Sequence, residues 1–113
     1  MKSKILALSK NEDFKTLIKK KKISNKYVTI FFGYLKNKDA NKLNISFSVK
    51  KKIGNAVKRN KIKRRLKNIV NDAVKNISIN NNFSFLVIAK STMLNSEFKN
   101  IKETLFQDFK KIK

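Results

Sequence analysis

The sequence contains no cysteine, no histidine and no proline, and it has only two glycines. Without cysteine there is no disulfide, no thiolate zinc site and no cysteine nucleophile. Without histidine the chain lacks the usual general base near neutral pH and the commonest metal ligand. With two glycines it has no glycine-rich loop of the kind that cradles phosphate. These absences favour a binding protein over a catalyst.

Acidic residues are also scarce, with seven Asp and Glu against 29 Lys and Arg. A nuclease that uses two metal ions needs several carboxylates that converge on ions about 4 Å apart. The acids here are scattered, so we predict no catalytic residue and no metal or other cofactor bound by protein side chains alone. The acids are Glu12, Asp13, Asp39, Asp72, Glu97, Glu103 and Asp108.

Long hydrophobic runs are missing as well. No apolar segment approaches the roughly 18 residues of a membrane span, and the N-terminal segment lacks the apolar core of a signal peptide. We therefore expect a cytoplasmic protein without a membrane partner. The 113 residues show no repeat and no linker, so we expect one domain, residues 1–113, with a modest core.

Positive charge dominates what is present, because the formal net charge is +22. Such a charge destabilises the compact state by self-repulsion and favours polyanionic partners. More than half of the residues from Lys50 to Lys67 are Lys or Arg, and none is acidic. Gly54 offers a turn, and Asn55 can accept a hydrogen bond from an early N–H of a following helix. The pattern predicts a basic helix that begins after Asn55 and ends near Asn76.

One edge of this helix is apolar and its flanks are basic. The apolar residues recur at three- and four-residue spacing and are Ile62, Leu66, Ile69, Val70, Ala73, Val74 and Ile77. One flank carries Asn60, Lys63, Arg64 and Lys67, and the other carries Lys58, Lys61 and Arg65. Arg59 lies in line with the stripe one turn earlier, where we expect the core to have ended. Like charges four residues apart each cost a helix about 0.2–0.5 kcal/mol, so a nucleic-acid-binding helix explains the pattern better than a solvated charged face.

The segment KKKIGNAVKRNKIKRRL resembles the signature of the bacterial ribonuclease P protein component, KK-[IV]-G-x-AV-x-RN-x-x-KR-x-[IL]. The matching residues are Lys51, Lys52, Gly54, Ala56, Val57, Arg59, Asn60, Lys63 and Arg64. Lys50, Lys61 and Lys67 stand where the family often has Ser, Arg and Arg. The resemblance extends loosely over nearly the whole chain and includes KNEDF at residues 10–14.

The resemblance implies that the chain is the protein subunit of ribonuclease P, an endoribonuclease that removes the 5′ leader of precursor tRNA. In that family the RNA subunit holds the catalytic Mg2+, and we expect one protein per RNA. The residues implied for binding the ribonuclease P RNA are Lys51, Lys52, Asn55, Arg59, Asn60, Lys61, Lys63, Arg64 and Lys67. The alternative is a small basic ribosomal or chromatin-type protein without a role in cleavage, which need not have this motif spacing.

The family also holds the single-stranded leader in a cleft between its first helix and its sheet. The residues implied for this site are Phe14, Ile18, Phe31 and Lys90, with Phe32 and Tyr34 open as alternatives to Phe31. Single strands bind where aromatic faces stack bases and cations follow the phosphates. From the residues alone, Phe14 is more simply a core residue, and for Phe31 the two interpretations are evenly matched.

Periodicity predicts the elements that precede the basic helix. Residues 9–20 read as a helix whose N-terminus carries a Ser9–Glu12 capping box. Residues 27–35 and 43–49 read as strands, and we expect these two to pair as an antiparallel hairpin. The second strand places small polar side chains on one face, which is solvated or lines an RNA-binding surface. These polar residues are Asn44, Ser46 and Ser48.

Two further elements follow the basic helix. Residues 83–89 are apolar enough to form a central strand, and Asn95 or Ser96 is expected to cap a last helix. The apolar stripe of that helix is Phe98, Ile101, Leu105, Phe109 and Ile112. The order α-β-β-α-β-α predicts an α+β sandwich with helices packed on a small mixed sheet. The resemblance, and not the sequence pattern, implies an unusual left-handed β-α-β crossover.

Overall fold

The computed structural model describes residues 5–6, 11–36, 38, 42–80 and 82–112. Its elements are β1 (Ile5–Leu6), α1 (Asn11–Leu17), β2 (Lys21–Ser24), β3 (Val28–Gly33), β4 (Leu43–Ser48), the 3-10 helix η1 (Lys51–Ile53), α2 (Ala56–Asn76), β5 (Ser84–Ala89), the 3-10 helix η2 (Ser91–Leu94) and α3 (Phe98–Lys111). The prediction of an α+β fold with helices on one small mixed sheet is confirmed.

The five strands lie in the order β1-β4-β5-β3-β2. β5 runs parallel to β4 and antiparallel to β3, so the prediction that residues 83–89 form a central strand is confirmed. The predicted hairpin between residues 27–35 and 43–49 is wrong, because β5 lies between β3 and β4. The physical reason is that β5 is buried on both faces along almost its whole length. A strand of that kind is stabilised most by a neighbour on each side.

β3 also pairs antiparallel with β2, the strand that directly precedes it in the chain. The sequence pattern did not reveal β2. β2 contains only one apolar residue, Ile23, and its lysines suit an edge strand, where charge discourages pairing with other chains. The turn into β3 is held by Asn25, whose Oδ1 accepts hydrogen bonds from the N–H groups of Tyr27 (2.7 Å) and Val28 (2.9 Å). The helix predicted over residues 9–20 therefore ends at Leu17, and Ser9 of its predicted capping box lies outside the described residues.

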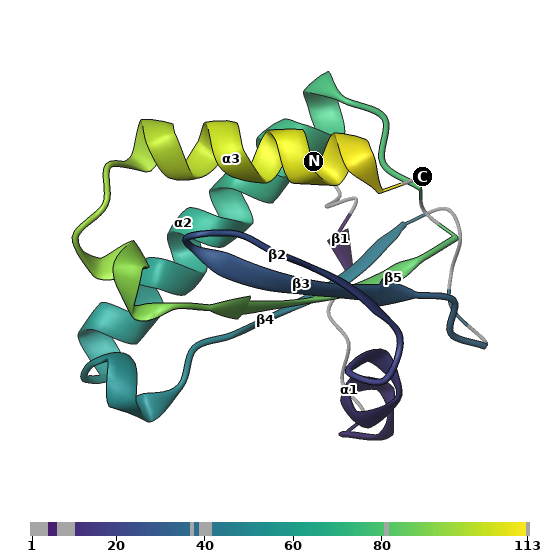
Figure 1. Cartoon of the computed structure of the whole chain (residues 1–113), viewed down its shortest axis with the longest axis horizontal. Helices are drawn as coiled ribbons and strands as arrows, with labels where there is room; N and C mark the ends of the chain where they lie inside the picture. Colours follow the sequence, from purple (N-terminus) through teal and green to yellow (C-terminus); the bar gives the residue numbers. More distant parts are fainter. Residues whose placement is uncertain (1–4, 7–10, 37, 39–41, 81, 113) are drawn as a thin grey trace.

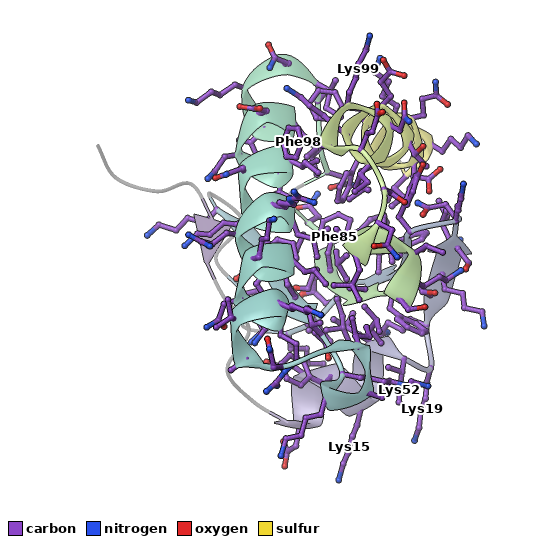
Figure 2. The ribbon with its side chains drawn as sticks, turned by 90° about the vertical axis from the view of Figure 1, so that its left-hand side faces the viewer. Lys15, Lys19, Lys52, Phe85, Phe98 and Lys99 are labelled. Carbon is purple, nitrogen blue, oxygen red and sulfur yellow. The ribbon has the colours of Figure 1, made fainter. Side chains whose placement is uncertain are left out.

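The two faces of the sheet are covered by different helices, with α2 and α3 on one side and α1 on the other (Figure 1). Val28, Ile30 and Phe32 of β3 belong to the larger core beneath α2 and α3, while Phe31 belongs to a smaller cluster around Leu17 of α1. Phe85 lies in the interior between the sheet and these two helices (Figure 2), and its ring is 5.8 Å from that of Phe109. Both faces of β3 are thus covered, as its apolar content predicted.

The last helix begins one or two residues later than predicted. Glu97 occupies the N-cap position without a side-chain hydrogen bond, so the proposed caps Asn95 and Ser96 are wrong. The Ser96 hydroxyl instead donates to the Thr92 carbonyl (2.6 Å), which closes the turn that leads out of η2. The predicted stripe is buried from its second member onward, while Phe98 at the first turn is 37% exposed.

The connection from β4 through α2 to β5 is a crossover between parallel strands. β4 lies behind β5 in the view of Figure 1, and α2 packs on the face that also carries α3 (Figures 1 and 2). When the molecule is turned so that α2 lies in front of the sheet and both parallel strands point upward, β5 lies to the left of β4. The crossover is left-handed, as the family resemblance implied, whereas about 98% of such connections are right-handed.

Candidate RNA-binding surfaces

The basic helix forms as its sequence predicts. The Asn55 side chain accepts a hydrogen bond from the Lys58 N–H (3.0 Å) and so caps the N-terminus of α2. The buried residues of α2 are Ile62, Leu66, Ile69, Val70 and Ala73. They anchor one edge of the helix on the larger core and leave the opposite side to solvent. Nitrogen atoms follow that outer side of α2 in Figure 2.

Most of the polar residues predicted to bind RNA are exposed on α2 or just before it. The exposed members are Lys51, Lys52, Asn55, Asn60, Lys61, Lys63, Arg64 and Lys67. In the described part of the chain, none of these cations forms an ion pair, because the three pairs present join Lys38 to Asp13, Lys102 to Asp72 and Lys111 to Asp108. Their charges are therefore available to an external polyanion.

Arg59 differs from its neighbours, because it is partly buried and its Nε is enclosed without a hydrogen-bond partner among the described residues. The first buried residue of α2 is Ile62, so Arg59 lies one turn before the core, as predicted, with only part of its side chain enclosed. An enclosed guanidinium nitrogen without a partner carries a desolvation cost. A phosphate oxygen that reached Arg59 would offset part of that cost.

The second flank of α2 lies beside η2, although Lys58 and Lys61 remain exposed. Lys58, Lys61 and Arg65 line a hollow of about 320 Å3 together with Met93 and Leu94 of η2. The two flanks that the sequence distinguishes are thus different surfaces: one is an open row of side chains, and the other is a walled groove.

The residues proposed for the leader lie on the α1 face of the sheet. Phe14 and Phe31 pack in the same cluster with Leu17, whereas Phe32 is 8% exposed and faces the core beneath α2 and α3. This placement favours Phe31 over Phe32 as the aromatic residue on the leader side. Ile18 follows α1 and is 49% exposed.

A groove of about 610 Å3 continues along this face beyond the cluster that contains Phe14 and Phe31. Its wall includes Thr29 and Ile88, which are directly paired across β3 and β5, and the three lysines 50, 52 and 90. Lys52 and Lys90 were predicted to serve two different RNAs, and the structure places them at one groove. Thr29 and Ile88 were missed, although the alternation of β3 would have placed Thr29 on the face of Phe31.

Lys90 is fixed by contacts to the turn between β2 and β3. Its Nζ donates hydrogen bonds to the Ser24 hydroxyl (2.8 Å) and to the Asn25 carbonyl (2.5 Å). The Asn25 side-chain amide donates in turn to Asp108 Oδ2 of α3 (2.6 Å), and Asp108 is only 6% exposed. Two hydrogen bonds therefore hold the Lys90 cation in place at the groove.

The polar face of β4 is largely covered. Asn44 and Ser46 are buried and Ser48 is partly exposed, so a solvated face is wrong for the first two residues. Ser48 pairs with Ile88 of β5. Only this last polar position of β4 adjoins the groove residues.

The acids do not gather at either surface. Among the described residues no three His, Cys, Asp or Glu side chains lie close enough to hold a metal ion, and Asp39 lies outside these residues. Three of the acids have structural partners: Asp13 pairs with Lys38, Asp72 with Lys102, and Asp108 binds Asn25.

Within the same described ranges, no helix is both long and apolar enough to span a bilayer. The cytoplasmic location stays a prediction.

Comparison with known proteins gives a consistent result. A family model described as Ribonuclease P matches residues 3–113. The ribonuclease P protein component of Carboxydothermus hydrogenoformans is 36% identical over 110 residues, which are 94% of this chain and 90% of that protein. The ribonuclease P protein component of Mesomycoplasma hyopneumoniae (strain 7448) is 37% identical over 112 residues, with coverage of 97% and 95%. The solved structure of the RNase P protein from Thermotoga maritima superposes with a TM-score of 0.76 at 26% identity and covers 96% of this chain and 98% of that one.

Proposed function

The chain belongs to the ribonuclease P protein component family, and from this premise we propose that it binds the RNA subunit through α2 and η1 and the 5′ leader of precursor tRNA through the groove at Lys90. As a ribonuclease P protein component it is a partner of ribonuclease P RNA and takes part in tRNA processing. The placement of its two RNA contacts is the part that we propose.

The open flank of α2 supports the contact with the RNA subunit. Asn60, Lys63 and Arg64 are exposed on it, and none has an ion-pair partner among the described side chains. Asn55 holds the helix start in place, and η1 presents Lys51 and Lys52 directly before it. Cations fixed on one rigid helix can neutralise successive phosphates without first losing much conformational freedom.

The groove on the α1 face supports the contact with the leader. Phe14 and Phe31 lie at one end of this face, and Lys52 and Lys90 lie at the other. Aromatic faces followed by cations are the arrangement that single-stranded RNA requires. We propose that a leader base packs against Phe14, Ile18 or Phe31 while the following phosphates reach the lysines.

We further propose that Mg2+ is held by the RNA subunit, with one protein per RNA, and that the protein contributes no reacting group. The observation that supports this division is the use of the acids: Asp13, Asp72 and Asp108 are already paired with Lys38, Lys102 and Asn25. The contribution of the protein is then charge neutralisation and positioning of the precursor, both of which matter most when Mg2+ is scarce.

Reconstitution tests the proposal. The purified chain is mixed with ribonuclease P RNA and a 5′-labelled precursor tRNA at low and at high Mg2+. We expect the chain to restore cleavage at the mature 5′ end at low Mg2+, and to cleave nothing without the RNA at either concentration. Polylysine of matched total charge is the control for non-specific screening. Equal stimulation by polylysine, or none by the chain, would support a general basic nucleic-acid-binding protein of the ribosomal type instead.

A further inference from the structure

A second hollow with aromatic walls lies away from both surfaces described above. It measures about 530 Å3 and is lined by the three lysines at residues 19–21, by Phe32, Gly33 and Tyr34, and by Phe83. It lies where β3 ends and β2 begins, whereas the N-terminal half of α2 lies at the opposite end of the sheet (Figure 1). The RNA-subunit contact and the leader groove proposed above use none of these residues, although Phe32 and Tyr34 were open as alternatives to Phe31 in the sequence.

The aromatic residues of this hollow differ in exposure: Phe32 and Phe83 form its floor, and Tyr34 beside them is open to solvent. The rings of Phe32 and Phe83 are 5.8 Å apart and are inclined at 45°, so they support each other at the edge of the core. Tyr34 next to them is 62% exposed, while the other tyrosine of the chain, Tyr27, is only 6% exposed. A planar group that stacks against this exposed ring would gain apolar contact on a wide, flat surface.

The cationic part comes from the lysine run after α1. Strand pairing sorts this run between the two faces: Lys21 is opposite Phe32 and Lys22 is opposite Phe31, so Lys21 belongs to the hollow and Lys22 to the leader side. Lys19 extends away from the body of the protein (Figure 2). The lysines at residues 19–21 are exposed, and they form no ion pair with any acid in the described ranges.

Gly33 brings one of these lysines close to the aromatic residues. A Cβ at position 33 would collide with the side chain of Lys20, so the glycine lets the aliphatic part of Lys20 lie directly against the strand. Lys20 also lines the hollow, next to Gly33 and Tyr34.

We propose that residues 19–21, Tyr34 and Phe83 form a second site for single-stranded RNA, separate from the leader groove. A base stacks on Tyr34 above the Phe32–Phe83 floor, and the lysines bind the adjoining phosphates. The occupant is single-stranded because bases in a duplex are already stacked and cannot insert beside the ring. Complementary charge selects a polyanion, and the exposed aromatic ring selects one that carries planar groups.

The fluorescence of tyrosine provides a test that reports on this site alone. The chain has two tyrosines and no tryptophan, so in a Tyr27→Phe variant Tyr34 is the only strong fluorophore. Titration of this full-length variant with a short oligoadenylate should quench its emission saturably, and duplex RNA of the same length should not. The matched control is Tyr34→Phe, which keeps only the buried Tyr27 and should show no saturable quenching.

The cations are tested against an equal change of charge elsewhere. Replacing Lys19, Lys20 and Lys21 by Gln should raise the oligoadenylate concentration at half-quenching at least several-fold. The control replaces Lys75, Lys99 and Lys110, which are exposed on other elements, and should change it much less. Absence of saturable quenching, or equal effects of the two triple variants, would overturn the proposal. Displacement of the oligoadenylate by oligoglutamate of equal charge would likewise overturn it, because a simple acidic peptide site would then suffice.

Discussion

Replacement of Arg64 by alanine tests whether this side chain contacts a phosphate of the RNA subunit or is only a solvated charge. Arg64 is exposed on the open flank of α2 and has no ion-pair partner among the described residues. Alanine is at least as good a helix former as arginine, so the fold should be unaffected. The change then removes one cation from the surface proposed for the RNA subunit and little else.

The expected size follows from counterion release. Each neutralised phosphate contributes about 0.9 to the slope of log affinity against log salt on a duplex and about 0.7 on a single strand. Between about 50 and 200 mM salt, loss of one contact should therefore change the ratio of wild-type to variant affinity by about 2.6- to 3.5-fold. The assay is equilibrium binding of the chain to ribonuclease P RNA at several salt concentrations, with the slope as the measured quantity.

Lys75→Ala provides the matched control on the same helix. Lys75 is exposed in the last turn of α2, about 16 Å further along the axis than Arg64. We expect it to leave the slope unchanged, because its distance exceeds the Debye length of about 10 Å at 0.1 M salt. An unchanged slope for Arg64→Ala, or an equal loss for both variants, would refute the assignment of this flank to RNA.

Two further substitutions test the leader side of the molecule. Phe14→Ala should weaken binding of precursor tRNA to the reconstituted enzyme by about 5- to 150-fold, as expected for one lost stack, and should hardly change binding of mature tRNA; equal losses for both ligands would make Phe14 a core residue only. Asp108→Ala should lower the free energy of unfolding in urea by about 1–3 kcal/mol because it leaves the Asn25 amide without its partner, whereas Asp72→Ala at an exposed ion pair should cost about 1 kcal/mol at most. A smaller loss for Asp108 than for Asp72 would show that the bond to Asn25 does not hold the turn.

Sequence reasoning succeeded where the determinants are local. The N-cap at Asn55 and the buried edge of α2 depend on residues within a few turns of one another, and both are confirmed. The central position of β5 also follows from its own composition, which is apolar on both faces.

Pairing between distant strands could not be read in the same way. Nothing within β3 or β4 shows that a strand more than 30 residues later lies between them, so the nearer pairing was predicted and was wrong. The same limit applies to the leader site. Phe31 and Phe32 are equally aromatic, and only the register with Leu86 and Phe85 of β5 decides which of them faces α1. Lys90 was predicted as a leader contact from its position after the third strand, and that role stays a prediction; its contacts to Ser24 and Asn25 depend on β2, which has almost no apolar pattern.

The central position of β5 also determines when the sheet can be completed during synthesis of the chain. The ribosome makes β4 before α2 and β5 last of the strands, and 35 residues lie between the end of β4 at Ser48 and the start of β5 at Ser84. At about 5–20 residues per second this interval lasts about 2–7 s. During that time β3 and β4 each have an unpaired edge, which is the state most open to aggregation. A nascent chain stopped after Asn76 and before Ser84 already carries the basic helix but has neither the strand that joins the two halves of the sheet nor the lysine at residue 90. Such a chain exposes the positive charge of α2 before the sheet beneath it is complete.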